Sequence, residues 1–168
     1  MDAQLQSETE KTFKGLYHAL APLSEQQVNT VPFAGSWTAG QVTEHIIKSA
    51  GGLNHVCGGP GIAVDRAQDE KVKAIRDLFL DFSVKFQAPD FIVPCNGPHN
   101  KEELLTSLRQ VEQEIGQLAA TTDLSPECAL FELPGFGKLT KFELLSFVLI
   151  HAQRHTRQLE NISRHLMS

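Results

Sequence analysis

The chain has 168 residues and a formal net charge of −5, with 41% hydrophobic and 21% charged residues. This length suits one domain with a single core, so we expect one domain over residues 1–168. The acidic balance argues against nucleic-acid binding, which normally requires a basic surface. No apolar run is long enough to span a bilayer, and no signal peptide is visible at the start of the sequence. We therefore expect no membrane partner and a cytoplasmic location.

The three cysteines, Cys57, Cys95 and Cys128, are far apart and form no CxxC pair. They indicate neither a zinc knuckle nor a disulfide framework. Reduced thiols in a cytoplasmic setting are the simplest interpretation. Small buried cysteines are the commoner case, and one free thiol at the edge of a site is the alternative.

Helical periodicity predicts a first helix over Ala3–Ala21, with Pro22 just past its end. A short helical turn is expected at Ser24–Val28, because Ser24 and Gln27 have the spacing of a capping box.

A second helix is predicted to begin after Trp37, where Thr38 and Gln41 form another capping box, and to continue to Val56. Its inward face combines one histidine with apolar and small residues: Val42, His45, Ile46, Ser49, Leu53 and Val56. His45 therefore points towards the core. Two glycines in SAGGLNHV weaken this helix or let a neighbour approach closely.

Residues 58–100 are less regular, with a shorter amphipathic helix in VDRAQDEKVKAIRDLFLDF and a proline-bearing connection after it. A crossover of this length is needed if the second and third long helices run parallel. Asn100 caps the third helix, with Glu103 at its third position. That helix has an apolar stripe of Leu104, Leu108, Val111, Ile115 and Leu118.

The segment SPECALFELPGFGKL reads as a turn-rich link with room for a short extended piece, and no alternating strand pattern of any length is visible. Thr140 and Glu143 form a capping box that opens the last helix. The expected fold class is therefore all-α.

His151 and His155 are four residues apart in the apolar run LLSFVLIHAQRHTRQLENI, which puts both imidazoles on one helix face. The same face carries Leu144, Val148, Leu159 and Ile162, so both histidines point inward. Together with His45 they form a candidate three-nitrogen metal site between two helices, with open coordination positions. The alternative is three buried histidines bonded to the backbone or to each other. Imidazole ligands suit zinc, nickel, iron or copper, so the residues do not select the metal.

Two segments carry a family resemblance: SWTAGQVTEHI (Ser36–Ile46) and GKLTKFELLSFVLIHAQRHTRQL (Gly137–Leu159). They resemble the two signature stretches of the DinB/YfiT-like superfamily, including the glutamine (Gln158) three residues after the second histidine of the pair. The resemblance implies a four-helix bundle with a long irregular crossover between its second and third helices. It also implies a divalent metal, zinc or nickel, held by His45, His151 and His155.

The resemblance leaves two functions open. The first is a metal-dependent enzyme acting on a small molecule, with a thiol transferase slightly favoured over a hydrolase. Characterised relatives look like thiol transferases and mycothiol-dependent isomerases, and no carboxylate in the sequence is placed as a general base beside the histidines. The partner would then be a low-molecular-weight thiol. The second is a non-catalytic, metal-stabilised stress-response or binding module; a homodimer is an option in either case.

Other polar and aromatic residues near the motifs have simpler interpretations. Trp37 is expected to plug the core, Glu44 to be a surface charge, and Arg154 to form a salt bridge at the rim or to hold an anionic substrate. Asn54 or Gln158 is expected to hydrogen-bond a ligand histidine. Three further histidines near element ends are expected to be solvated: His18, His99 and His165.

Overall fold

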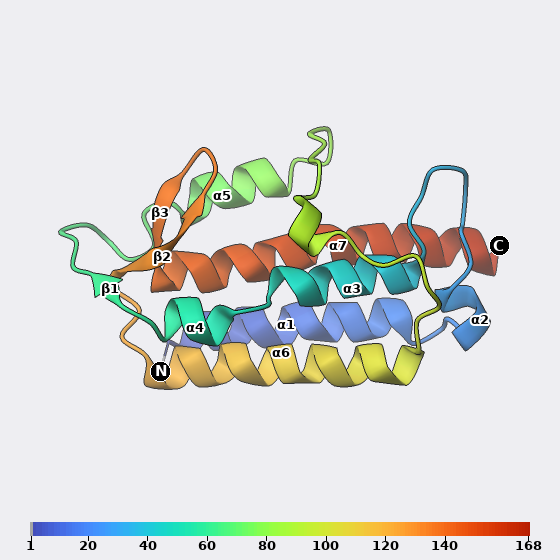
Figure 1. Ribbon diagram of the computed structural model, residues 1–168, viewed down its shortest axis with the longest axis horizontal. Coiled ribbons are helices and arrows are strands. Elements are labelled where there is room, and N and C mark those ends of the chain that lie inside the picture. The colour runs from blue at the N-terminus through green and yellow to red at the C-terminus, as the bar shows by residue number, and fades with distance from the viewer. Residues whose placement is uncertain (1) are drawn as a thin grey trace.

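The computed structural model describes residues 2–168, which are mostly helical with one small sheet (Figure 1). The helices are α1 (Ala3–Leu20), α2 (Glu25–Val28), α3 (Ala39–Ser49), α4 (Leu53–Cys57), α5 (Val72–Phe79), the 3₁₀ helix η1 (Asp90–Ile92), α6 (Lys101–Thr121) and α7 (Lys141–Met167). The strands are β1 (Gly61–Ile62), β2 (Glu127–Leu133) and β3 (Gly137–Thr140). Among the described residues, no helix combines the length and apolarity that a membrane crossing requires.

The starts of α1, α2, α3, α6 and α7 are those predicted from the sequence, whereas the amphipathic helix predicted within residues 64–82 is formed only over α5. Capping boxes open α2, α3 and α7, each with its side-chain oxygen accepting from a backbone N–H and its third residue bonding back. The side chain of Asn100 accepts from the backbone N–H of Glu103 at the start of α6. These starts set the rotation of each helix, and with it the face that each helix buries.

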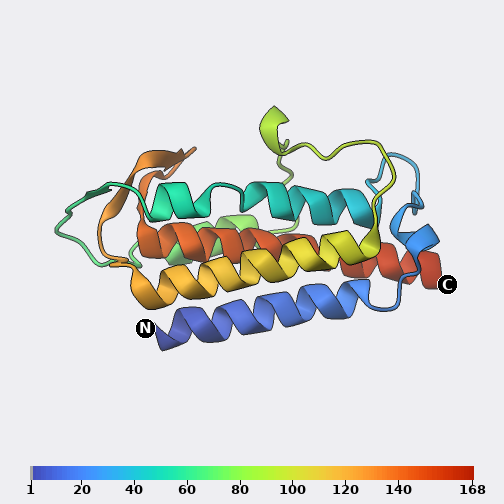
Figure 2. The ribbon, with the colours of Figure 1, turned by 60° about the horizontal axis from the view of Figure 1, so that its bottom comes forward.

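The helices α3 and α1 each pack against both α6 and α7, and α3 and α1 lie at opposite edges of this bundle in Figure 2, with α7 and α6 between them (Figures 1 and 2). The colours show that α3 and α6 run in one direction and α1 and α7 in the other, so the crossover does connect parallel helices. The core between them includes the apolar face predicted for the last helix and the entire stripe predicted for the third: Leu144, Val148, Leu159, Ile162, Leu104, Leu108, Val111, Ile115 and Leu118. This packing places α3 directly against α7.

The second predicted helix is shorter than expected. It ends at Ser49, the chain turns at Ala50 and Gly51, and α4 starts after Gly52, which has a φ of +80°. Only glycine adopts that backbone conformation without strain, so the double glycine breaks the helix instead of merely weakening it. His45 is unaffected, because it lies one turn before the break.

The sheet is the main difference from the expected all-α fold. Strands β2 and β3 form an antiparallel hairpin, and the short β1 pairs with the outer edge of β2. The β2–β3 register shifts between Glu127 and Glu132, which is a bulge or irregularity that breaks the period-2 burial pattern. As a result Cys128 is buried while Leu130, two residues later, is exposed, and the segment has no regular alternation to detect.

A buried ion pair fixes the start of α7. Arg66 in the crossover donates two hydrogen bonds to the fully buried carboxylate of Glu143, at 2.7 and 2.8 Å, and a third to Glu127 at 3.0 Å. Burial raises the pKa of Glu143. The bonds from Arg66 and from the backbone N–H groups of Lys71 and Thr140 lower this pKa by more than burial raises it, so the net pKa is below its usual value. The crossover, the hairpin and the site-bearing helix are thereby joined at one point.

Candidate metal centre

The structure brings the three predicted histidines together. The Nε2 atom of His151 lies 3.2 Å from the Nε2 of His45 and 3.1 Å from the Nε2 of His155. His151 and His155 share a face of α7 because they are one turn apart, and His45 comes from the facing helix α3. All three ligand atoms lie within 4.8 Å of one another, so the group could hold a metal ion.

Hydrogen bonds to the outer ring nitrogens orient two of these imidazoles. The Nδ1 of His45 lies 2.9 Å from the carbonyl oxygen of Ile92 in η1, and the Nδ1 of His155 lies 2.8 Å from the Oε1 of Gln158. A carbonyl oxygen only accepts, so each Nδ1 carries the proton and each Nε2 keeps a lone pair. The Nε2 atoms of His45 and His155 both face the Nε2 of His151, so the three ring nitrogens are grouped as metal ligation requires.

The environment also favours uncharged imidazoles. Burial lowers the pKa of His155 to about 4 and lowers the pKa of His45 as well. Burial lowers the pKa of His151 furthest, with the charges of His155, His45 and Arg154 acting in the same direction. Neutral imidazole is the form that binds a metal, so near pH 7 no proton has to be displaced from these rings.

Aromatic rings flank the group on two sides. The ring of Trp37, just before α3, lies 5.2 Å from that of His45, and the ring of Phe147, one turn before His151, lies 6.0 Å from the His151 ring. His45 is only 3% exposed, whereas His151 and His155 are partly exposed. Solvent therefore does not reach the group past His45 of α3, but it does contact His151 and His155 of α7.

The donor set fits a divalent transition metal. Three neutral nitrogen donors from two rigid helices leave at least one coordination position without a protein ligand, as in catalytic sites. The set contains no thiolate and no carboxylate, so it favours imidazole-binding metals but does not select among them. The metal itself stays a prediction.

The structure also shows the contacts of three further residues considered in the sequence analysis, Gln158, Asn54 and Arg154. Gln158 is the partner of a ligand histidine, as predicted, while the backbone N–H of Asn54 donates instead to Glu114 at 2.8 Å. Arg154 neither forms a rim salt bridge nor points at a substrate position. Its guanidinium donates to the carbonyl oxygens of Phe79, Asp81 and Val84 at the end of α5 and in the loop after it. It thereby fixes the loop beside the histidines.

Two predictions about charged residues near the site are wrong. His18 and His165 are exposed as expected, but His99 is buried and pairs with Glu44 at 2.6 Å. Glu44 is accordingly not a simple surface charge. No local sequence signal indicates this pair, because Glu44 and His99 are far apart in the chain. The role of Ile92 has no sequence signal, because its contribution is a backbone carbonyl.

One of three comparisons with known proteins gives a match. No curated protein and no solved structure gives a significant match. The family model described as the DinB superfamily matches residues 8–159, which include all three histidines and most of the chain. With this match over most of its length, the chain belongs to the DinB superfamily.

Proposed function

We propose that this protein is a metalloprotein with the four-helix-bundle fold of its superfamily, in which His45, His151 and His155 hold one zinc or nickel ion. The observation that carries the proposal is the convergence of three Nε2 atoms, two of them with their Nδ1 protons committed to Ile92 and Gln158. A neutral His151 protonated on Nε2 could donate to only one of its two neighbours, at 3.1 or 3.2 Å, and would leave the other lone pair unmatched. Burial disfavours the further proton that would make one of these rings a cation, whereas a metal ion would accept all three lone pairs.

The favoured activity is that of a metal-dependent enzyme acting on a small molecule. A divalent ion bound here would act as a Lewis acid that makes a water molecule or a thiol more acidic. The residues of the chain hold the ion rigidly, keep the imidazoles neutral and leave the side along α7 accessible. Transfer of a low-molecular-weight thiol is preferred to hydrolysis, because the histidine group includes no carboxylate to serve as a general base.

One observation favours a non-catalytic role as the second candidate. Two cavities in the described part of the chain measure about 40 and about 60 Å³, and no histidine of the group lines either of them. Small-molecule sites usually enclose several hundred Å³. Neither of these two cavities therefore offers a small molecule a place at the histidine group. A metal-stabilised binding module needs no such place.

The first test is the metal content of protein purified without an affinity tag, measured by plasma mass spectrometry. Wild type is compared with His155→Ala and with His55→Ala, a matched control because His55 is exposed on α4. We expect zinc or nickel in the wild type and the control, and one ion fewer per chain in His155→Ala. Equal metal content in all three proteins, or none after incubation with both metals, would contradict the proposed site.

A second measurement separates the two roles. The metal-loaded protein is assayed for thiol transfer to a chloronitrobenzene electrophile and for hydrolysis of a nitrophenyl ester, in parallel with thermal unfolding. An enzyme loses activity in His151→Ala and remains folded. A binding module shows no turnover with either substrate, and its main loss on metal removal is a lower unfolding temperature.

A further inference from the structure

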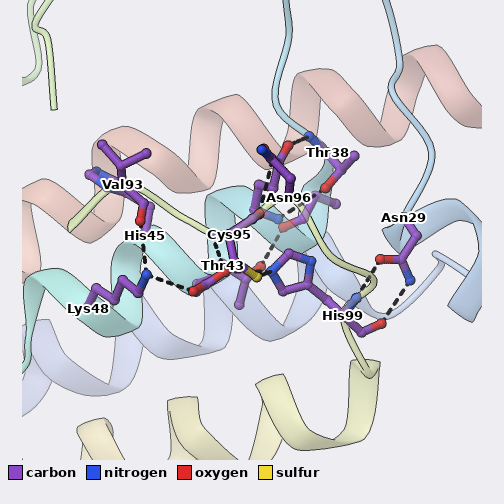
Figure 3. A network of polar contacts seen from close by, with 12 residues as sticks. Asn29, Thr38, Thr43, His45, Lys48, Val93, Cys95, Asn96 and His99 are labelled. Carbon is purple, nitrogen blue, oxygen red and sulfur yellow. Dashed lines mark hydrogen bonds and ion pairs between the residues drawn. The ribbon is translucent and has the colours of Figure 1, made fainter. Parts of the chain in front are cut away.

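A second group of ligand-type side chains lies beside the histidine group and shares none of its residues. Glu44 precedes His45 on α3 and points about 100° away from it around the helix. Its Oε2 lies 2.6 Å from the Nε2 of His99, which in turn lies 3.7 Å from the Sγ of Cys95. All three ligand atoms lie within 4.8 Å of one another. Figure 3 shows the sulfur of Cys95 beside the ring of His99.

The three donor types and their spacing suit zinc. Zinc binds cysteine thiolate, imidazole and carboxylate, and in a tetrahedral site the sulfur and nitrogen ligand atoms are about 3.6 Å apart. The distance of 3.7 Å between the Sγ of Cys95 and the Nε2 of His99 is already close to that value. The contact between Glu44 and His99 would have to open from its 2.6 Å hydrogen-bond length to about 3.3 Å. Binding would release the Cys95 thiol proton to solvent. The proton that the Nε2 of His99 donates to Glu44 would also go to solvent while the Nδ1 takes one up, so that the ring stays neutral and its Nε2 can bind the ion.

The imidazole of the group is held in place from two sides. The backbone N–H of His99 donates to the Oδ1 of Asn29 at 2.7 Å, and the Nδ2 of Asn29 donates to the His99 carbonyl at 2.8 Å. The ring lies directly on Gly40, where a Cβ atom would come within 2.9 Å of it. A buried ring clamped in this way presents its Nε2 in one direction only, which is the property of a preorganised ligand.

The sulfur and the carboxylate are held by further bonds across the same gap. The backbone N–H of Cys95 donates to Glu44 at 3.0 Å, and the side chain of Gln41 donates to the Cys95 carbonyl at 3.2 Å. Lys48 occupies the other carboxylate oxygen at 2.9 Å, so only Oε2 faces the group. Cys95 is exposed, which gives an ion access from solvent.

We propose that Glu44, Cys95 and His99 form a second metal site, for a zinc-like divalent ion, which ties the crossover to α3. Such an ion would bridge α3 and residues 95–99, which already meet through the bonds of Glu44 to Cys95 and His99. Ile92, the residue whose carbonyl orients His45, is three positions before Cys95. An ion at this site would therefore also stabilise the segment that orients a ligand of the histidine group.

Cobalt(II) tests this site separately from the first, because only the second site contains sulfur. Metal-free protein is titrated with cobalt(II), and the near-ultraviolet charge-transfer band between thiolate and cobalt is recorded. The other two cysteines are buried, with thiol pKa values raised by burial, to about 12 for Cys57 and about 11 for Cys128. We expect the band in the wild type and in His151→Ala, and its loss in Cys95→Ser and in His99→Gln.

Each other outcome overturns the proposal. A wild type with no band in excess cobalt(II), or a band that survives in Cys95→Ser, excludes coordination by this thiol. A band lost in Cys95→Ser but kept in both His99→Gln and Glu44→Gln identifies cobalt bound to an exposed thiol alone. Far-ultraviolet circular dichroism of each variant checks its fold, and exposed Cys95 makes serine a mild substitution there. Failure of the histidine group leaves these results unchanged.

Discussion

Gln158 lies one turn after His155 on α7, and its Oε1 accepts the Nδ1 proton of that histidine at 2.8 Å. This contact fixes both the rotation of the His155 ring and its tautomer. Gln158 is not one of the three candidate ligands, yet it determines the direction in which the Nε2 of His155 points. The backbone carbonyl of Ile92 does the same for His45 from the crossover. The site therefore depends on a local contact within one helix and on a distant contact from a loop.

Replacing Gln158 with leucine is expected to weaken metal binding by about 10- to 100-fold, since the Nδ1 proton of His155 loses its acceptor. Competition with a chromophoric chelator measures the change. Gln153→Leu is the matched control, because that glutamine is on the same helix but bonds Glu8 and Thr12 of α1. Equal loss of affinity in both variants would contradict the orienting role.

The metal-free protein is expected to lose stability as the pH falls from about 6.5 to about 4. Unfolded histidines take up protons near their ordinary pKa of 6.5, whereas His155 in the folded chain does so only near 4. The unfolded state thus binds more protons within that window, and His155 alone contributes up to ~3 kcal/mol. His45 and His151, whose pKa values are also lowered by burial, act in the same direction.

Urea unfolding with a chelator present, repeated between pH 7.5 and pH 4, measures this dependence. In His155→Gln the curve of unfolding free energy against pH should become flatter over the same range. A wild-type curve without slope between these pH values would mean that the histidines titrate normally in the folded protein.

Arg66→Ala is expected to lower the free energy of unfolding by about 3 kcal/mol, because it leaves the carboxylate of Glu143 buried without its cation. Arg164→Ala, at an exposed position of α7, should change it by less than about 0.5 kcal/mol. Urea denaturation gives both values. Adding Glu143→Gln to Arg66→Ala should cost less than the sum of the single changes; strict additivity would show that the pair is not coupled.

Gly40→Ala and Gly116→Ala are expected to have opposite effects. A Cβ at position 40 would meet the His99 ring at 2.9 Å, and Asn29 prevents that residue from moving away, so we expect a loss of about 1–3 kcal/mol. A Cβ at position 116 in α6 meets nothing within 4 Å, and alanine there should add about 0.5–1 kcal/mol. Thermal unfolding of both variants checks the signs, and a stabilising Gly40→Ala would show that the ring is free to shift.

Local sequence was sufficient to predict the capped helix starts and the shared face of His151 and His155, two of the three candidate ligands. A capping box involves residues three apart, and His151 and His155 share a face because of helix geometry alone, so neither prediction needs the rest of the chain. The inward orientation of His45 follows in the same way from the periodicity of α3. These are properties of contacts between near neighbours in sequence.

The remaining features depend on contacts between distant segments. The pairing of α3 with α7 brings His45 to the other two histidines, and only packing fixes the carbonyl of Ile92 against it. The bulge in β2 removes the alternation by which a strand is recognised, so the hairpin is visible only once its pairing is known. The burial of His99 against Glu44 has the same origin. His99 is in the crossover and contacts a helix that ended fifty residues earlier, so no local sequence pattern predicts this contact.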